Sequence, residues 1–107
     1  MAEKQKFTAI GRRKRSVAKV TLVAGKGNIT VNGKDVKDYM PYETLVMDLV
    51  QPLELVDARE KYDINVVVKG GGFSGQTGAI RLGITRALML ANSETRPTLK
   101  ANGMVTR

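Results

Sequence analysis

The 107-residue sequence predicts an α+β protein in which helices pack on one face of a β-sheet. Two hydrophobic periods predict this class. Apolar residues alternate with polar ones over 16–32 and again over 62–69, which is typical of strands. They recur every three or four positions over 36–50 and 76–91, which is typical of amphipathic helices. The expected order is β-β-β-α-β-α-α, and the length predicts a single domain over residues 1–107.

Three strands are expected to open the chain, over Lys6–Ile10, Ser16–Val23 and 28–32. Gly25–Gly27 is a turn signal between the second and third of them and predicts that these two strands pair as a hairpin. Asn32-Gly33 is a further turn signal where the third strand ends.

The middle of the chain predicts one helix and the clearest strand. Pro41 suits the first turn of a helix whose apolar stripe covers 45–50, and Pro52 is expected to end that helix. An acidic connecting segment, 53–63, leads into the strand Tyr62–Lys69.

The last third predicts a long helix over 76–91 and a short one over Ser93–Asn102. Gly75, Ala79 and Gly83 fall on one stripe of the long helix. We expect this stripe to pack closely against the sheet, the alternative being a smooth face for a nucleic-acid backbone. The core is expected at the apolar positions of both periods: Ala18, Val20, Leu22, Ile29, Val31, Leu45, Leu49, Ile64, Val66, Val68, Ile80, Ile84 and Leu88.

Composition narrows the function. The chain has 18 Lys and Arg against 10 Asp and Glu, a net charge of +8, and neither Cys nor His. Disulfides, thiolate metal sites and Cys nucleophiles are excluded, and the commonest general base is missing. We therefore predict a protein that is not an enzyme and has no cofactor and no metal site. Membrane binding is not expected, because no stretch reaches the roughly 18 apolar residues of a membrane span and the N-terminus lacks a signal-peptide core.

The charges are segregated along the chain. Residues 1–40 carry ten basic and three acidic side chains, residues 41–64 two and six, and residues 65–107 six and one. Two basic stretches flank an acidic middle, which predicts one strongly positive region on the folded surface. The acidic spacing matches no calcium loop, so we expect a solvated face turned away from an anionic partner.

The densest basic run, Arg12-Arg13-Lys14-Arg15, lies between the first two predicted strands and is expected in a loop or hairpin tip. Four adjacent cations on a chain of this net charge favour polyphosphate binding over a solvated charge run. Aromatic residues are few and are not interleaved with the run. Phosphate and shape contacts to folded RNA are therefore expected rather than base stacking.

A glycine motif, Gly70-x-Gly72-x-x-Gly75, lies between the predicted strand and the long helix. It matches the dinucleotide fingerprint, but no second strand follows to complete a nucleotide-binding half. Two interpretations remain open. Backbone amides at the start of the helix meet a phosphate, or a tight turn needs glycine only for its dihedral angles.

Seven blocks of the sequence fit one pattern: Gly11–Ala18, Gly27–Gly33, Gln51–Leu53, Lys69–Gln76, Gly78–Arg81, Arg96-Pro97 and Lys100–Met104. Together they resemble the bacterial ribosomal protein called small-subunit protein nine, along essentially the whole chain. The resemblance implies a mixed four-stranded sheet with helices on one face. It further implies a likeness to the second domain of small-subunit protein five and a left-handed β-α-β crossover.

The same resemblance implies a structural constituent of the small ribosomal subunit, in the cytoplasmic ribosome. The partners implied are small-subunit ribosomal RNA and neighbouring ribosomal proteins of the subunit head. Family members continue into a long basic tail that reaches transfer RNA, whereas this sequence ends at Arg107, so no transfer RNA contact is expected of it.

The motifs and the resemblance together predict an RNA-binding set and no catalytic residues. The expected set is Arg12, Arg13, Lys14, Arg15, Lys69, Gly71, Gly72, Phe73, Ser74, Gln76, Arg81, Arg86 and Lys100. The alternative function is a small nucleotide-phosphate-binding module that uses Gly70–Gly75, and an unspecialised basic interaction domain ranks third.

Overall fold

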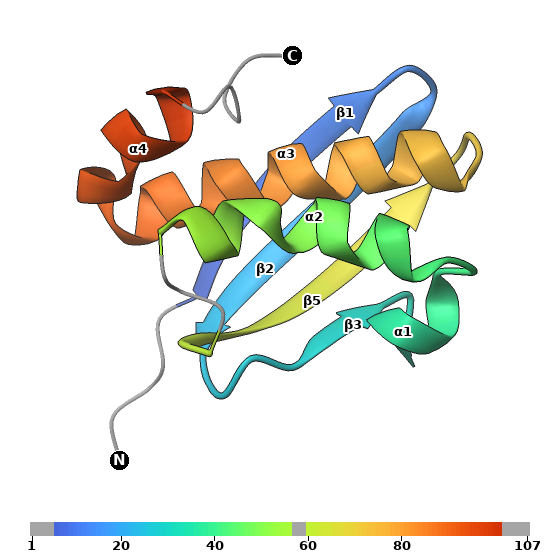
Figure 1. The fold of residues 1–107 in the computed structure, drawn as a ribbon, viewed down its shortest axis with the longest axis horizontal. Helices are drawn as coiled ribbons and strands as arrows, with labels where there is room; N and C mark the ends of the chain where they lie inside the picture. Colours follow the sequence, from blue (N-terminus) through green and yellow to red (C-terminus); the bar gives the residue numbers. More distant parts are fainter. Residues whose placement is uncertain (1–5, 57–59, 102–107) are drawn as a thin grey trace.

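The computed structural model describes residues 6–56 and 60–101 and shows one five-stranded sheet with helices on one face (Figure 1). The strands are β1 (Lys6–Arg13), β2 (Ser16–Ala24), β3 (Ile29–Val31), β4 (Lys34–Asp35) and β5 (Tyr62–Lys69). The α+β class and the mixed sheet are confirmed, because β3 and β5 pair in parallel and all other neighbours are antiparallel. The strand count of four is wrong, because β4 adds a two-residue edge strand.

The strand order β1-β2-β5-β3-β4 corrects the predicted pairing of the second and third strands. β5 lies between β2 and β3, so that Val66 is the register partner of both Val20 and Val31. Gly25–Gly27 therefore does not close a hairpin. It connects two strands, β2 and β3, that are separated in the sheet by β5, which follows more than thirty residues later. The Asn32-Gly33 turn is confirmed and joins β3 to β4, with positive φ angles of 52° and 83°.

The helices are α1 (Val36–Tyr39), α2 (Glu43–Leu55), α3 (Phe73–Ala91) and α4 (Arg96–Ala101), with a short 3-10 turn, η1 (Ser93–Thr95), before α4. The predicted helix around Pro41 is split into α1 and α2, because a proline holds the preceding residue, Met40, in an extended conformation. Pro52 does not end α2. Pro52 is buried inside the helix, which continues to Leu55.

The core lies between the sheet and the layer of α2 and α3 (Figure 1). Twelve of the thirteen predicted core residues are buried, and Leu45 is half-buried at the edge. Residues of the helices and of the α1–α2 connection complete the core; they are Val36, Met40, Val46, Val50, Leu53, Ala79, Leu82, Ala87 and Leu99. The short helix α4 enters this core through Leu99, which is fully buried.

The small-residue stripe of α3 packs directly on the first two strands. A Cβ at Gly11 would overlap the carbonyl oxygen of Ala79 and the backbone nitrogen of Gly83. A Cβ at Gly83 would lie 2.6 Å from Cγ2 of Val20. The expectation of close packing is confirmed, and this stripe has no room for a nucleic-acid backbone.

Candidate nucleic-acid interface

The basic run forms the end of the β1–β2 hairpin. Arg13 and Ser16 are register partners, so Lys14 and Arg15 make a two-residue turn in which Lys14 has a φ of 56°. The predicted hairpin tip is confirmed, but Arg12 and Arg13 belong to β1 rather than to a loop. All four side chains are exposed. Strand pairing thus holds four cations at one end of the molecule, where their repulsion has to be offset by solvent or by an anion.

Ser16 joins this hairpin to the glycine loop that follows β5. Its side chain is fully buried, and its Oγ donates a hydrogen bond of 2.8 Å to the carbonyl oxygen of Gly70, 54 residues away in sequence. The tip of the hairpin and the start of α3 are therefore one continuous surface. We call it the tip surface: Arg12–Arg15, Lys69 and Gly70–Phe73.

Gly70 and Gly71 are required by the fold. Their φ angles are 80° and 66°, a region that residues with a Cβ rarely adopt. A Cβ at Gly70 would also overlap the carbonyl oxygen of Arg15, and one at Gly71 would overlap Oγ of Ser16. The turn alone therefore explains why glycine stands at these two positions, without a bound phosphate.

Gly72 differs from its two neighbours. It is the N-cap of α3, its φ of −89° and ψ of 175° suit any residue, and a Cβ there would meet nothing within 4 Å. Neither the dihedral angles nor the packing of the protein requires glycine here. The space in front of Gly72 adjoins the free backbone N–H groups of the first turn of α3, which favour an anion.

A second contact between distant segments fixes the orientation of this loop. The hydroxyl of Tyr39 donates to Oε1 of Gln76 at 2.7 Å, and Nε2 of Gln76 donates to the carbonyl oxygen of Gly70 at 3.2 Å. The ring of Tyr39 meets that of Phe73 edge-on at 5.7 Å. Gln76 was predicted to bind RNA, and the structure uses its amide to hold the glycine loop; its contact with RNA stays a prediction.

Asn32 supports the same region from the β3–β4 turn. Its Oδ1 accepts from the backbone N–H of Val68 at 2.9 Å and its Nδ2 donates to the carbonyl oxygen of Val68 at 3.1 Å. The side chain thereby extends the β3–β5 pairing by one residue toward Lys69. Sequence reasoning missed Asn32 and Tyr39 as supports of the site, because Asn32 carries only a turn signal and Tyr39 carries none.

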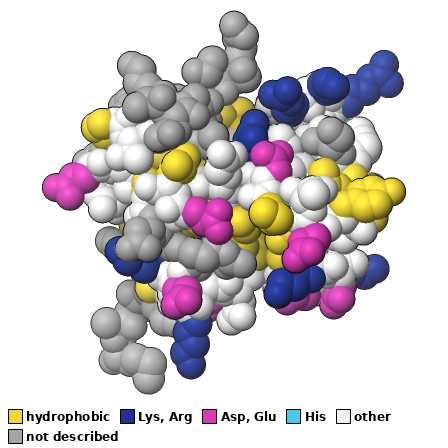
Figure 2. Space-filling model, in the orientation of Figure 1, with side chains coloured by type: hydrophobic (Ala, Val, Ile, Leu, Met, Phe, Trp, Pro, Cys, Tyr) yellow, Lys and Arg dark blue, Asp and Glu magenta, His cyan; other side chains and the backbone are white. Residues whose placement is uncertain are grey.

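Positive charge is densest at one end of the visible surface. Figure 2 shows Lys and Arg gathered over the β1–β2 hairpin, at the upper right, and Asp and Glu spread over the helical face. Within residues 6–56 and 60–101, no cluster of His, Cys, Asp and Glu could hold a metal ion. Among the helices in the described part of the chain, none is long and apolar enough to cross a membrane.

Two comparisons with known proteins identify the family of this chain. A family model described as ribosomal protein S9/S16 matches residues 11–107. Small ribosomal subunit protein uS9 of Mesoplasma florum is 54% identical over 107 residues, which cover 100% of this chain and 82% of that relative. The chain belongs to the ribosomal protein S9/S16 family. It is a structural protein of the small ribosomal subunit in the cytoplasm, and it is not an enzyme.

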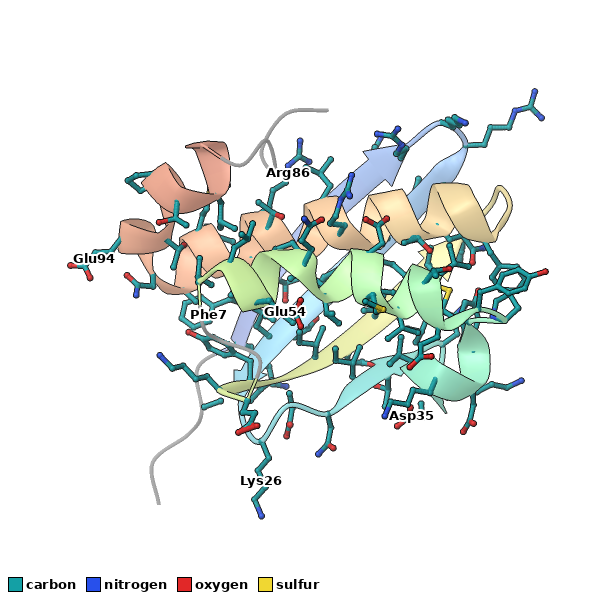
Figure 3. The ribbon with its side chains drawn as sticks, viewed as in Figure 1. Phe7, Lys26, Asp35, Glu54, Arg86 and Glu94 are labelled. Carbon is teal, nitrogen blue, oxygen red and sulfur yellow. The ribbon has the colours of Figure 1, made fainter. Side chains whose placement is uncertain are left out.

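The other predicted RNA-binding residues of this S9-family protein lie outside the tip surface. Arg81 on α3 makes an ion pair of 2.7 Å with Asp48 of α2. Nη1 of Arg86 donates to the carbonyl oxygen of Ile10 at 2.8 Å, on the side of α3 that faces β1 (Figure 3). Lys100 lies in α4, at the opposite end of α3 from the glycine loop (Figure 1), and its side chain is outside the described set, as is that of Ser74.

Proposed function

We propose that this S9-family protein binds small-subunit ribosomal RNA through the tip surface. The observation that carries the proposal is the Ser16–Gly70 hydrogen bond, because it makes one surface of two motifs that each point to a phosphate. Membership of the family supports a ribosomal RNA partner. Neighbouring ribosomal proteins of the subunit head complete the expected surroundings, and no transfer RNA contact is proposed for residues 6–56 and 60–101.

The tip surface suits phosphate contacts better than base reading. All five cations of this surface are exposed. Arg12 and Arg13 end β1, Lys14 and Arg15 form the turn to β2, and Lys69 ends β5 on the other side of β2. At Gly72 the absence of a side chain lets a phosphate oxygen approach the N–H groups at the start of α3. Phe73 is the one aromatic ring of this surface, 44% exposed, so it offers a single apolar contact rather than a stacking platform.

The remaining sequence predictions form an outer set of contacts. We infer that Ser74, Gln76, Arg81, Arg86 and Lys100 touch RNA only as it continues along α3, because the described side chains among them already bond within the protein. The connection from β3 through α1 and α2 to β5 joins adjacent parallel strands on one face of the sheet. We propose that it is the left-handed crossover implied by the likeness to small-subunit protein five.

The alternative, a nucleotide-phosphate module, is not favoured by the geometry. Gly75 of the motif faces Ser16, with a Cβ position 3.0 Å from its Oγ, rather than open space. In addition, α3 is followed by η1 and α4 rather than by the strand that a dinucleotide fold needs. The hollow beside α1 and α2, about 400 Å³ in volume, is lined by eight residues between Lys37 and Glu54. None of the described loop residues lines it.

The test measures affinity for a transcript of the head region of small-subunit ribosomal RNA as a function of salt. The double variant Lys14→Ala/Arg15→Ala is compared with Lys34→Ala/Lys37→Ala, which removes the same charge from β4 and α1. Each lost phosphate contact lowers the slope of log affinity against log salt by about 0.7–0.9. Equal slopes for the two double variants would remove the basis of the proposal, and saturable mononucleotide binding that persists in moderate salt would favour the alternative.

A further inference from the structure

The sheet has a face that no described helix covers. In Figure 1 the helices stand in front of the sheet. Along β1, β2 and β5 the buried positions alternate with more exposed ones, which belong to the other face of the sheet. Next to the hairpin this side carries nine positions, three on each of β1, β2 and β5. We call them the open face: Thr8, Ile10, Arg12, Val17, Lys19, Thr21, Asn65, Val67 and Lys69.

The register of the strands arranges the open face in three rows. The row nearest the tip is Arg12–Val17–Lys69, and the next row is Ile10–Lys19–Val67. The first row runs cation, aliphatic, cation across the three strands. The second row runs aliphatic, cation, aliphatic. Lys19 therefore has only aliphatic neighbours within these two rows. Ile10 and Val67 flank it on the adjacent strands, and Val17 precedes it on its own strand.

The aliphatic members of the pattern are unusually exposed. Ile10 is 44% exposed, Val17 is 40% and Val67 is 47%, although the solvent side of a sheet normally carries polar residues. No acidic residue belongs to the open face. The nearest acid along β5 is Asp63, whose Oδ1 accepts hydrogen bonds from the backbone N–H groups of Lys26 and Asn28 at 3.0 and 3.1 Å.

The third row of the open face is polar. Oγ1 atoms of Thr8 and Thr21 lie 3.3 Å apart, and Oγ1 of Thr30, on β3, donates to Oδ1 of Asn65 at 3.1 Å. Away from the tip, the face thus passes from cations and aliphatics to hydroxyls and an amide. This arrangement of cations, aliphatic groups and hydroxyls fits an RNA strand, which presents phosphates, ribose carbons and 2′-hydroxyls close together.

We propose that the open face is a second RNA-binding surface, centred on Lys19 and continuous with the tip surface through Arg12 and Lys69. This proposal rests on the proposed function, because the open face would bind the same ribosomal RNA as the tip surface. Lys19 binds a phosphate, Ile10 and Val67 pack against riboses, and the threonine row meets 2′-hydroxyls. An open sheet face three strands wide suits the wide and shallow minor groove of A-form RNA.

A protein partner fits the open face less well. A protein would need acids opposite Arg12, Lys19 and Lys69 together with apolar groups between them, whereas any RNA backbone supplies both at once. Continuity with the tip surface also argues for one ligand, since Arg12 belongs to both surfaces.

The test uses the same head-region transcript and the full chain. Lys19→Ala is expected to lower the slope of log affinity against log salt by about 0.7–0.9, as one phosphate contact does. Lys19→Arg is expected to keep the slope, which shows that charge rather than the lysine stem is required. The matched control is Lys26→Ala, because Lys26 extends from the far end of the molecule, away from the hairpin (Figure 3).

The aliphatic contacts are tested by Val67→Thr, which keeps the shape of the side chain and replaces one methyl with a hydroxyl. Loss of one buried methyl lowers the affinity by about fourfold and leaves the salt slope unchanged. Val23→Thr makes the same change at the far end of the sheet, where β2 pairs with Asp63, and is expected to have no effect on RNA. Thermal melting of each variant checks that the fold is intact.

Three outcomes overturn the inference. In the first, Lys19→Ala keeps the wild-type slope of log affinity against log salt. In the second, Val67→Thr has the same RNA affinity as Val23→Thr. In the third, Lys19→Ala and Val67→Thr change self-association or the binding of another protein while RNA binding is unchanged. The Lys14→Ala/Arg15→Ala variant, measured in parallel, separates the two proposals. If it alone lowers the slope, RNA binding by the tip stands and the open face fails; if no variant lowers the slope, both fail.

Discussion

The hairpin end and the helical layer of this protein treat their cations differently. At the hairpin, Arg12–Arg15 and Lys69 are exposed. Ser16 bonds Gly70 there, and the stem of Arg13 lies against Gly78 of α3. In the helical layer, Arg81 pairs with Asp48, and Arg86 bonds the backbone of β1. Side chains at the end of a hairpin have few neighbouring elements to bond with, whereas side chains along a packed helix meet adjacent elements. The first region is therefore available to an anion, and the second is partly neutralised.

The largest effect is expected where the hairpin end is held together. Gly71→Ala would force a residue with a Cβ to a φ of 66° and against Oγ of Ser16, which would break the Ser16–Gly70 hydrogen bond. We expect the free energy of unfolding to fall by about 2 kcal/mol or more, from strain and overpacking together.

Thermal and urea unfolding measure this loss, with the wild-type chain expected to melt cooperatively in the absence of RNA. Gly33→Ala is the control, because Gly33 has a φ of 83° but an open surrounding, so that it reports the dihedral strain alone. Equal losses for the two variants would mean that the contact with Ser16 contributes nothing.

A smaller effect with opposite signs is expected at Gly72. Gly72→Asp puts a preferred N-cap residue at the start of α3, so stability should rise by about 0.5 kcal/mol. The same carboxylate would repel a phosphate in front of the helix, so RNA affinity should fall by about tenfold, as a loss of about 1.4 kcal/mol implies.

Gly72→Asn is the matched neutral N-cap. It should stabilise the helix in the same way and weaken RNA binding much less, because it adds volume without charge. Unfolding curves and RNA titrations of both variants are the measurements. If Asp and Asn at this position bind RNA equally, no phosphate lies in front of α3.

The smallest effect is expected in the helical layer. Arg81→Ala removes a part-exposed ion pair and should lower the free energy of unfolding by about 0.2–1 kcal/mol. Its salt slope for RNA should change less than that of Lys14→Ala/Arg15→Ala, because Asp48 already satisfies part of the guanidinium.

A double-mutant cycle with Asp48→Ala isolates the coupling energy of the pair. A drop in the salt slope by a full phosphate contact would instead place Arg81 beside the tip residues, and the contrast between the two regions would be lost.

Much of this fold follows from hydrophobic periodicity alone. Alternation placed Val20, Val66 and Leu22 in the core, and the helical stripes placed Leu49 and Ile84 there. Density of charge likewise indicated Arg12–Arg15 as the exposed tip. These predictions succeed because each depends on residues close together in the sequence, so that the pattern itself decides which side faces water.

Only the tertiary structure shows the strand order and the roles of the loop glycines, because both depend on contacts between segments that are distant in the sequence. Insertion of β5 between β2 and β3 leaves no trace in either hairpin signal, because strand partners at long separation are chosen by the burial of whole faces. The distinction between Gly71 and Gly72 is of the same kind. Both are loop glycines in the sequence. Gly71 has a positive φ and packs against Ser16, more than fifty residues earlier, whereas Gly72 has an ordinary φ and open space in front of it. Sequence periodicity determined which residues are buried, and contacts between distant segments determined which glycine is free to meet a ligand.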